Sequence, residues 1–189
     1  MRKLYHVPSI TVGLVLLLLA VSPSLAATSG PSVQILGENS VRTNHGVTST
    51  YRFAPGRLDV QPGAVITFSS TVPCQIDCDH TISIVNKGEL PSGVVQTFQC
   101  LFDFPGTVCA KITDLVFPHG PGGPANPIVT VPGEPSGFKD GNTFLIRQGQ
   151  TLEIVVTAPS GTTIHYMCAI HPWMQAAITV GNNDSNSDD

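Results

Sequence analysis

The chain has 189 residues, of which 41% are hydrophobic and 12% charged, and its formal net charge at pH 7 is −4. Proteins that bind nucleic acid cluster Lys and Arg on one face, so nine basic residues against thirteen acidic ones argue against a nucleic-acid partner. Without its N-terminal segment, described next, the chain is roughly 160 residues long, which is the length of one domain.

The first 26 residues have the features of a secretory signal peptide. Arg2 and Lys3 form a basic start, residues 10–21 are an apolar run, and small residues follow up to Ala26. A membrane span needs about 20 apolar residues, so this run is short for one and we expect cleavage after Ala26. The sequence therefore predicts an extracytoplasmic protein, secreted or periplasmic, that is held at a membrane only if the segment (1–26) is retained as an anchor.

Short runs rich in Val, Ile and Thr, separated by Pro-Gly turns, favour an all-β fold for the domain (27–181). Strands are expected at residues 33–36, 48–53, 57–60, 64–70, 80–85, 142–147, 151–157, 162–168 and 174–180. The polar, acidic tail (182–189) is expected to be disordered.

Residues from about 87 to 141 interrupt the pattern of strands and turns. They carry two short segments with several apolar residues, 94–98 and 111–117, on either side of a loop that contains Cys100 and Cys109. The Pro/Gly-rich stretch that follows cannot be a regular central strand. We interpret the segment as a long, disulfide-containing insertion that covers one end or edge of the domain.

One short stretch near the C-terminus concentrates metal-binding side chains. Cys168, His171 and Met174 follow one another at three-residue steps, so a compact loop can wrap a single metal ion. A thiolate and a thioether are soft ligands and an imidazole is borderline, a combination that suits copper. Zinc sites use Cys, His and carboxylates, so Met174 favours copper over zinc.

The remaining ligand is expected from His80, at the start of a strand. With the period of two that strands have, His80, Ile82 and Ile84 share the apolar face, while Thr81 and Ser83 share the polar one. The imidazole is therefore expected to point into the core.

The loop at 168–174 resembles the ligand loop of the cupredoxins, with a spacing closest to that of amicyanin. The stretch 53–68 is similar to the cupredoxin lead-in to the first His ligand, and the resemblance as a whole covers residues 50–86 and 143–181. It implies a Greek-key β-sandwich of the plastocyanin/amicyanin kind with one type 1 (blue) copper ion. The ligands that it implies are His80, Cys168, His171 and Met174.

The chain departs from these families at two positions. Plastocyanin and amicyanin usually have Asn after the first His ligand, where it braces the ligand loop, and this chain has Thr81. They have Pro before the second His, and this chain has Ile170, whose backbone N–H can point toward the Cys168 sulfur. Hydrogen bonds around that sulfur tune the reduction potential, so the Ile170 departure bears on it. With Thr81 in place of Asn, the brace of the ligand loop is expected to be weaker or different.

A copper-bound thiolate cannot be in a disulfide, so assigning Cys168 to copper leaves four cysteines in an exported chain. Four cysteines allow three pairings, of which we favour Cys74–Cys78 with Cys100–Cys109. The alternative is a second metal site on Cys74 and Cys78, which would compete with copper for the first His ligand.

The function implied by the resemblance is one-electron transfer, without enzymatic activity because the ligand set leaves no open position for substrate. Trp173 beside His171 is expected to form an apolar docking patch for a redox partner protein. The alternative is a protein that binds, buffers or delivers copper in the cell envelope, but three Met do not make a Met-rich transfer surface. A fragment of a multicopper enzyme would need further His-rich sites, and the sequence has no His-x-His pair.

Overall fold

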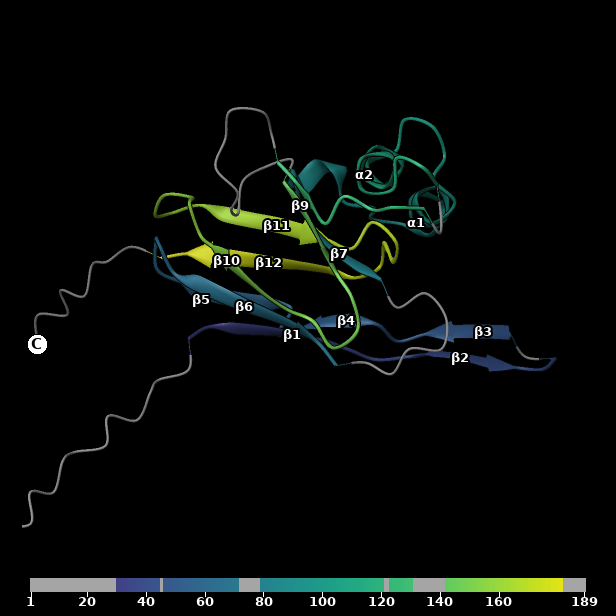
Figure 1. Ribbon diagram of the computed structural model, residues 1–189, viewed down its shortest axis with the longest axis horizontal. Coiled ribbons are helices and arrows are strands. Elements are labelled where there is room, and N and C mark those ends of the chain that lie inside the picture. Colours follow the sequence, from purple (N-terminus) through teal and green to yellow (C-terminus); the bar gives the residue numbers. More distant parts are fainter. Residues whose placement is uncertain (1–29, 45, 72–78, 121–122, 131–141, 182–189) are drawn as a thin grey trace, which may run out of the picture.

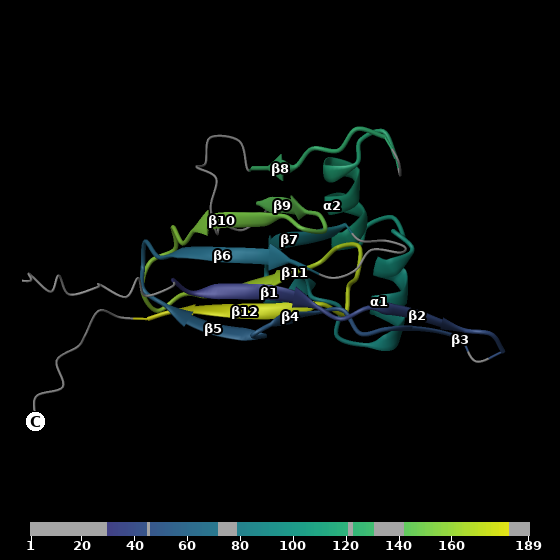
Figure 2. The same cartoon turned by 60° about the horizontal axis from the view of Figure 1, so that its bottom comes forward.

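Two β-sheets face each other and two helices lie against the outer side of one of them (Figures 1 and 2). The computed structural model describes residues 30–44, 46–71, 79–120, 123–130 and 142–181. The predicted signal segment, the acidic tail, Cys74 and Cys78 lie outside the described residues.

The first sheet has four strands in the order β10–β6–β1–β4. Its strands are β1 (Ser32–Leu36), β4 (Arg52–Ala54), β6 (Val65–Ser70) and β10 (Thr151–Val155). The second sheet has six strands in the order β5–β12–β11–β7–β9–β8. Its strands are β5 (Arg57–Val60), β7 (His80–Val85), β8 (Ile128–Val129), β9 (Thr143–Ile146), β11 (Thr163–Met167) and β12 (Gln175–Val180). The β1–β6 and β5–β12 pairs are parallel, and the other pairs in the two sheets are antiparallel.

A hairpin of β2 (Asn39–Arg42) and β3 (Gly46–Ser49) extends beyond the two sheets (Figure 2). The sequence predicted one strand over 48–53, and the structure has two, β3 and β4. The run changes partner at Thr50, because β3 pairs with β2 whereas β4 pairs with β1.

Side chains from the inner faces of both sheets form the main hydrophobic core. Its fully buried members include Val33, Ile35, Ile66, Phe68, Ile82, Ile146, Tyr166 and Ile178. These residues alternate along their strands with residues on the outer faces, as a half-buried strand requires. The predicted inward face of β7 is confirmed, because Ile82 and Ile84 belong to this main core.

The register of β7 and β11 determines where the predicted metal ligands lie. The two strands are antiparallel, with Tyr166 opposite Ile84 and Met167 opposite Ser83. The C-terminal end of β11 therefore lies beside the N-terminal end of β7. Cys168, directly after β11, and His80, the first residue of β7, are brought to the same end of the sandwich.

The two segments of the insertion that contain several apolar residues lie in helices, α1 (Val94–Leu101) and α2 (Val108–Val116), preceded by the 3-10 helix η1 (Lys87–Glu89). The sequence analysis predicted no helix here. The Thr107 hydroxyl caps α2 by accepting the N–H of Ala110 at 3.2 Å. Among the described residues, no helix is both long and apolar enough to cross a membrane.

The predicted Cys100–Cys109 disulfide is confirmed, and it joins the end of α1 to the start of α2. The fold is therefore a mostly β sandwich with a disulfide-containing insertion, as predicted, except that the insertion is helical. In α2, the buried residues Cys109, Ile112 and Val116 recur at helical spacing.

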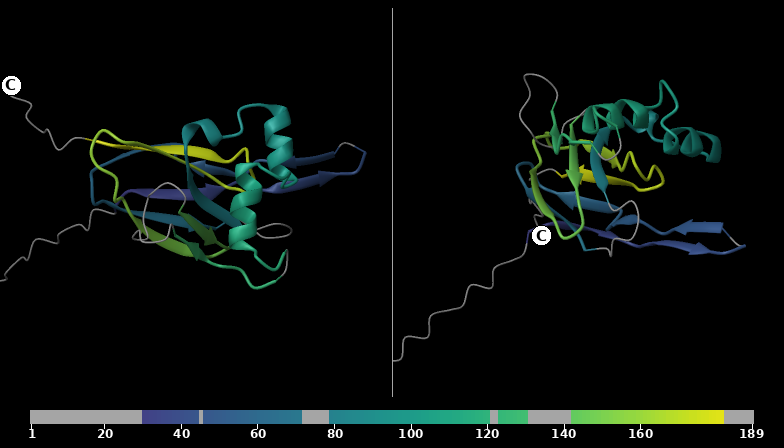
Figure 3. Two further views of the ribbon diagram at one scale, coloured as in Figure 1. Left: turned by 90° about the horizontal axis from the view of Figure 1, so that it is seen from above. Right: turned by 45° about the vertical axis from the view of Figure 1, so that its right-hand side comes forward.

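The helices cover the outer face of the six-stranded sheet and form a second hydrophobic core there (Figure 3). The sheet and the ligand loop contribute Val85, Leu145, Met167 and Ala169, and the helices contribute Cys100, Cys109, Ile112 and Val116. The outer face of β7 is thus as dry as its inner face, and all six residues of β7 are buried.

Shortening a side chain on the inner face of α2 should destabilise the protein, because that face packs into the second hydrophobic core. Ile112 is 8% exposed, so Ile112→Ala is expected to lower the free energy of unfolding by about 2–5 kcal/mol. Leu115, on the same helix, is 53% exposed, so Leu115→Ala should change it by no more than about 0.5 kcal/mol. Urea unfolding of both variants makes the comparison, and equally small effects would show that α2 does not pack as described.

Candidate metal centre

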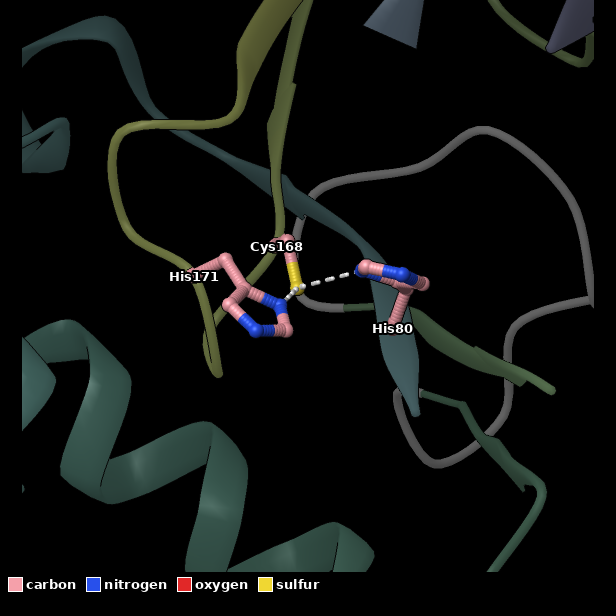
Figure 4. Close-up of side chains that lie close together, drawn as sticks. All are labelled: His80, Cys168 and His171. Carbon is pink, nitrogen blue, oxygen red and sulfur yellow. Dashed lines mark hydrogen bonds between the residues drawn. The ribbon is translucent and has the colours of Figure 1, made fainter. Parts of the chain in front are cut away.

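Three side chains converge at one end of the sandwich: His80, Cys168 and His171 (Figure 4). The Cys168 Sγ lies 3.9 Å from Nδ1 of His80 and 3.7 Å from Nδ1 of His171. The three potential ligand atoms all lie within 4.8 Å of one another. A single ion can therefore reach two imidazole nitrogens and one sulfur at once.

The ligand loop between β11 and β12 is closed by its own backbone. The N–H of Cys168 donates to the carbonyl of Met174 at 3.0 Å, and the N–H of Met174 donates to the carbonyl of His171 at 2.8 Å. Both bonds hold the three residues of the predicted motif in one compact turn. The backbone of Met174 is thereby fixed to both neighbouring members of the motif.

All members of the motif are removed from water. His80 and Cys168 are 0% exposed, Met174 is 1% and His171 is 3%. Burial, together with the neighbouring His171, lowers the pKa of His80 to about 3. His80 is therefore neutral at ordinary pH and has a lone pair to offer to a metal ion.

A purely structural role for His80 leaves its hydrogen bonding unexplained. Its Nε2 is buried and has no hydrogen-bond partner among the described residues, and its Nδ1 faces the Cys168 sulfur. A buried polar group without a partner is costly, whereas a histidine that binds a metal through Nδ1 has a reason to present that atom. Cys74 and Cys78 of the alternative metal site lie outside the described residues, so that alternative stays a prediction.

The donor set fits one copper ion of the type 1 kind. Two imidazoles and one thiolate are the equatorial ligands of such sites, with a weak axial Met. Met174 is buried within the main core and fixed by its backbone. Its thioether as the fourth ligand stays a prediction.

The Cys168 sulfur is surrounded by hydrogen-bond donors. Burial raises the pKa of its thiol, and hydrogen bonds from Thr81 and from the backbone of His171 and Ile170 act in the opposite direction. The Thr81 N–H lies 3.3 Å from the sulfur. The backbone donor expected from Ile170 stays a prediction.

Thr81 also braces the ligand loop, in the position where plastocyanin and amicyanin have Asn. Its Oγ1 accepts the backbone N–H of Ala169 at 2.8 Å. Thr81 is 0% exposed, so this bond is shielded from competition by water. The brace is thus a hydroxyl rather than an amide.

Tyr51 contacts both imidazoles and was missed by the sequence analysis. Its ring centroid lies 4.8 Å from that of His80 and 4.9 Å from that of His171, both edge-on. Tyr51 is 3% exposed and directly precedes β4. The only signal in the sequence was its alternation with Phe53, which is also buried.

Trp173 covers the less buried of the two imidazoles. Its ring lies 5.4 Å from that of His171, and it is 36% exposed. The side-chain amide of Gln175 donates to the carbonyls of Pro172, at 2.9 Å, and Pro91, at 2.8 Å. The insertion is thereby attached to the ligand loop.

Comparison with known proteins finds similar solved structures at low identity. The chain is 14% identical to a purple cupredoxin from Nitrosopumilus maritimus, covering 80% of this chain and 99% of that one, with a TM-score of 0.38. It is 20% identical to auracyanin A, a blue copper protein from Chloroflexus aurantiacus, covering 80% and 100%, with a TM-score of 0.39. It is 12% identical to a copper nitrite reductase from Nitrosomonas europaea, covering 82% and 42%, with a TM-score of 0.34.

No family model matches the chain. No curated protein matches it either. At these identities and TM-scores the structural matches add no argument about the site. The cupredoxin-like sandwich and the type 1 donor set are seen in the strand order and the side-chain cluster of this chain.

The metal-free protein should lose stability in acid because of His80. The pKa of His80 is about 3 in the folded protein, against an ordinary value of 6.5 for an exposed histidine. Between these two pH values the unfolded chain therefore binds more protons than the folded protein. The free energy of unfolding should therefore fall with falling pH in this window, by up to about 1.4 kcal/mol per pH unit from this group.

Urea unfolding of the metal-free protein at a series of pH values measures this dependence. His80→Phe, which cannot titrate, should flatten it. If the variant and the natural protein lose stability in parallel across the window, His80 is not buried in its neutral form.

Proposed function

We propose that the protein transfers single electrons through a type 1 copper centre in an extracytoplasmic compartment. The observation that carries this proposal is the convergence of two imidazole Nδ1 atoms and one buried thiol at the sandwich end. Bound copper would supply the one-electron change between Cu(II) and Cu(I).

The chain's own contribution is a set of donors fixed before a metal arrives. His80 belongs to β7, which is hydrogen-bonded on both sides, to β11 and β9. Cys168 is held by backbone bonds to the loop and by Thr81. Donors held in this way move little when the charge of a bound ion changes, and a small rearrangement favours fast electron exchange.

The burial of the donors supports electron transfer over catalysis. His80 and Cys168 are 0% exposed and His171 is 3%, which leaves no open side on which a substrate could reach a metal. We therefore propose that the chain is not an enzyme in its own right.

A redox partner protein is proposed to dock over Trp173 and the His171 edge beneath it. Trp173 is 36% exposed and contacts the His171 ring. Partly exposed aromatic side chains are enriched at protein interfaces. His171 is the least buried of the three donors, so this edge is the proposed route for the electron.

The alternative function is copper binding, buffering or delivery in the cell envelope. Delivery requires that an acceptor protein reach the ligands, and two of the three donors have no exposed surface. The geometry thus supports retention of the metal over its transfer.

Loading the purified protein with Cu(II) tests the proposal. We expect an intense visible absorption band from thiolate-to-copper charge transfer, and a reversible one-electron wave in voltammetry. Cys168→Ser should abolish the band and keep the far-ultraviolet circular dichroism of the sandwich, since Ser is a close isostere of Cys.

His119→Ala is the matched control, because His119 is exposed and lies outside the cluster. It should leave both the band and the wave unchanged. Copper binding without colour, or colour without a reversible wave, would count against electron transfer; the second result would favour the copper-binding alternative.

A further inference from the structure

The helix α1 turns its apolar side away from the rest of the molecule. Cys100 is its one buried residue. Five large apolar side chains of the helix and of its C-terminal cap are between 41% and 86% exposed: Val94, Val95, Phe98, Leu101 and Phe102. Apolar side chains of a surface helix ordinarily face the core, so this helix has the reverse orientation.

The five exposed side chains share one face of the helix. Successive residues of an α-helix are rotated by about 100°, so positions 94, 95, 98, 101 and 102 fall within an arc of about 120°. Cys100 falls on the opposite side, where its disulfide joins the helix to α2. Gln96 and Gln99 lie between these two sides and line a hollow formed with η1 and α2. The helix is therefore attached to the molecule by its polar side.

Three phenyl rings form the centre of the exposed face. The Phe98 ring lies 4.6 Å from that of Phe102 and 6.3 Å from that of Phe104, in the loop after α1. The three rings are 43–58% exposed and present roughly 200–400 Å² of apolar surface. The two valines and the leucine enlarge this area. Contiguous apolar patches of that size mark interaction sites, whereas single exposed apolar residues do not.

We call this surface the α1 face, and no helix or strand of the described part of the chain covers it. α2 lies against β8 and β9, and α1 lies against α2. Figure 1 views both helices nearly end-on, with α1 at the outer margin of the molecule. The α1 face is thus free to meet another molecule.

Charge narrows the choice of that molecule. Residues 92–102 include no Asp, Glu, Lys or Arg, although the whole chain has a net charge of −4. Helices that lie on membranes carry Lys and Arg on their polar side, and α1 has neither. Two copies of an acidic chain repel each other where their acidic residues meet, and a charge-free face avoids that repulsion. Charge therefore favours a second copy of this chain over a lipid surface.

We propose that the α1 face is an interface between two copies of this chain, with α1 packed against α1 about a two-fold axis. Such a contact needs a surface that is complementary to itself, and an uncharged apolar helix is. Val94, Phe98 and Phe102 recur at i, i+4 and i+8, the ridge that packs into the grooves of a second helix. Two such faces lie at or below the roughly 1,200 Å² at which stable interfaces begin, so the dimer is weak and reversible.

Sedimentation equilibrium of the metal-free chain, up to millimolar concentration, tests the interface independently of the proposed electron transfer. The average mass should rise from one copy toward two as the concentration increases. Added salt should strengthen the association, because it screens the repulsion between two acidic copies. Phe98→Asp should weaken dimerisation by at least about tenfold, since it places a charge at the centre of the contact.

Leu115→Asp is the matched control. Leu115 is 53% exposed and Phe98 is 54% exposed, so both variants add one negative charge at an equally exposed helical position. Leu115, however, belongs to α2, and Leu115→Asp should dimerise as the natural chain does. If Phe98→Asp does not fold, Val94→Asp takes its place, because Val94 is 86% exposed.

A mixture of Phe98→Asp and Phe98→Lys distinguishes a two-fold contact from other effects of charge. Phe98 is near the middle of α1, so a two-fold axis brings it close to its counterpart in the second copy. Each variant alone should stay monomeric, and the equimolar mixture should form the dimer again. A mixture that stays monomeric would contradict the proposed axis.

Two further results would overturn the interface. One is a natural chain that is monomeric at every concentration, or a Phe98→Asp dimer as tight as the natural one. The other is a dimer that added salt dissociates, because an apolar contact gains from screening. A monomer that binds phosphatidylcholine vesicles, and loses this binding in Phe98→Asp, would assign the α1 face to a membrane instead.

Discussion

The burial of the Cys168 sulfur between two imidazoles is the constraint on which the rest of the structure depends. A fully buried thiol resists ionisation, since burial raises its pKa. A thiolate becomes tolerable there only when donors and a cation surround it. The chain provides a backbone donor from Thr81 and two imidazole nitrogens for the cation. The arrangement of the site is therefore governed by one negative charge, the Cys168 thiolate, at a position that water does not reach.

Two hydrophobic cores together hold the Cys168 sulfur in place. The main core, between the sheets, fixes the start of β7 and the end of β11 and hence the positions of His80 and Cys168. The second core, beneath α1 and α2, closes the outer face of β7 and of the ligand loop. The main core thus determines which ligands lie close together, and the second core determines how well water is excluded around them.

The site was more predictable from the sequence than its surroundings were. Three-residue spacing and strand alternation are local rules that identified Cys168, His171 and His80 as candidates, and the cupredoxin resemblance placed them around one ion. The burial of Thr81 and the contacts of Tyr51 with the two imidazoles depend on segments that are distant in the sequence. The helices of the insertion were missed because short apolar runs look alike in strands and helices, and because apolar residues of α1 such as Phe98 face solvent. No local sequence pattern indicates the contacts between distant segments that bury Thr81 and place Tyr51.

X-ray absorption spectroscopy of the copper-loaded protein tests the central claim most directly, because it counts the atoms bound to the metal. We expect one short copper–sulfur bond together with two imidazole nitrogens, in both oxidation states. Coordination by nitrogen and oxygen alone, or a sulfur that leaves on reduction, would contradict a centre built on Cys168, His80 and His171.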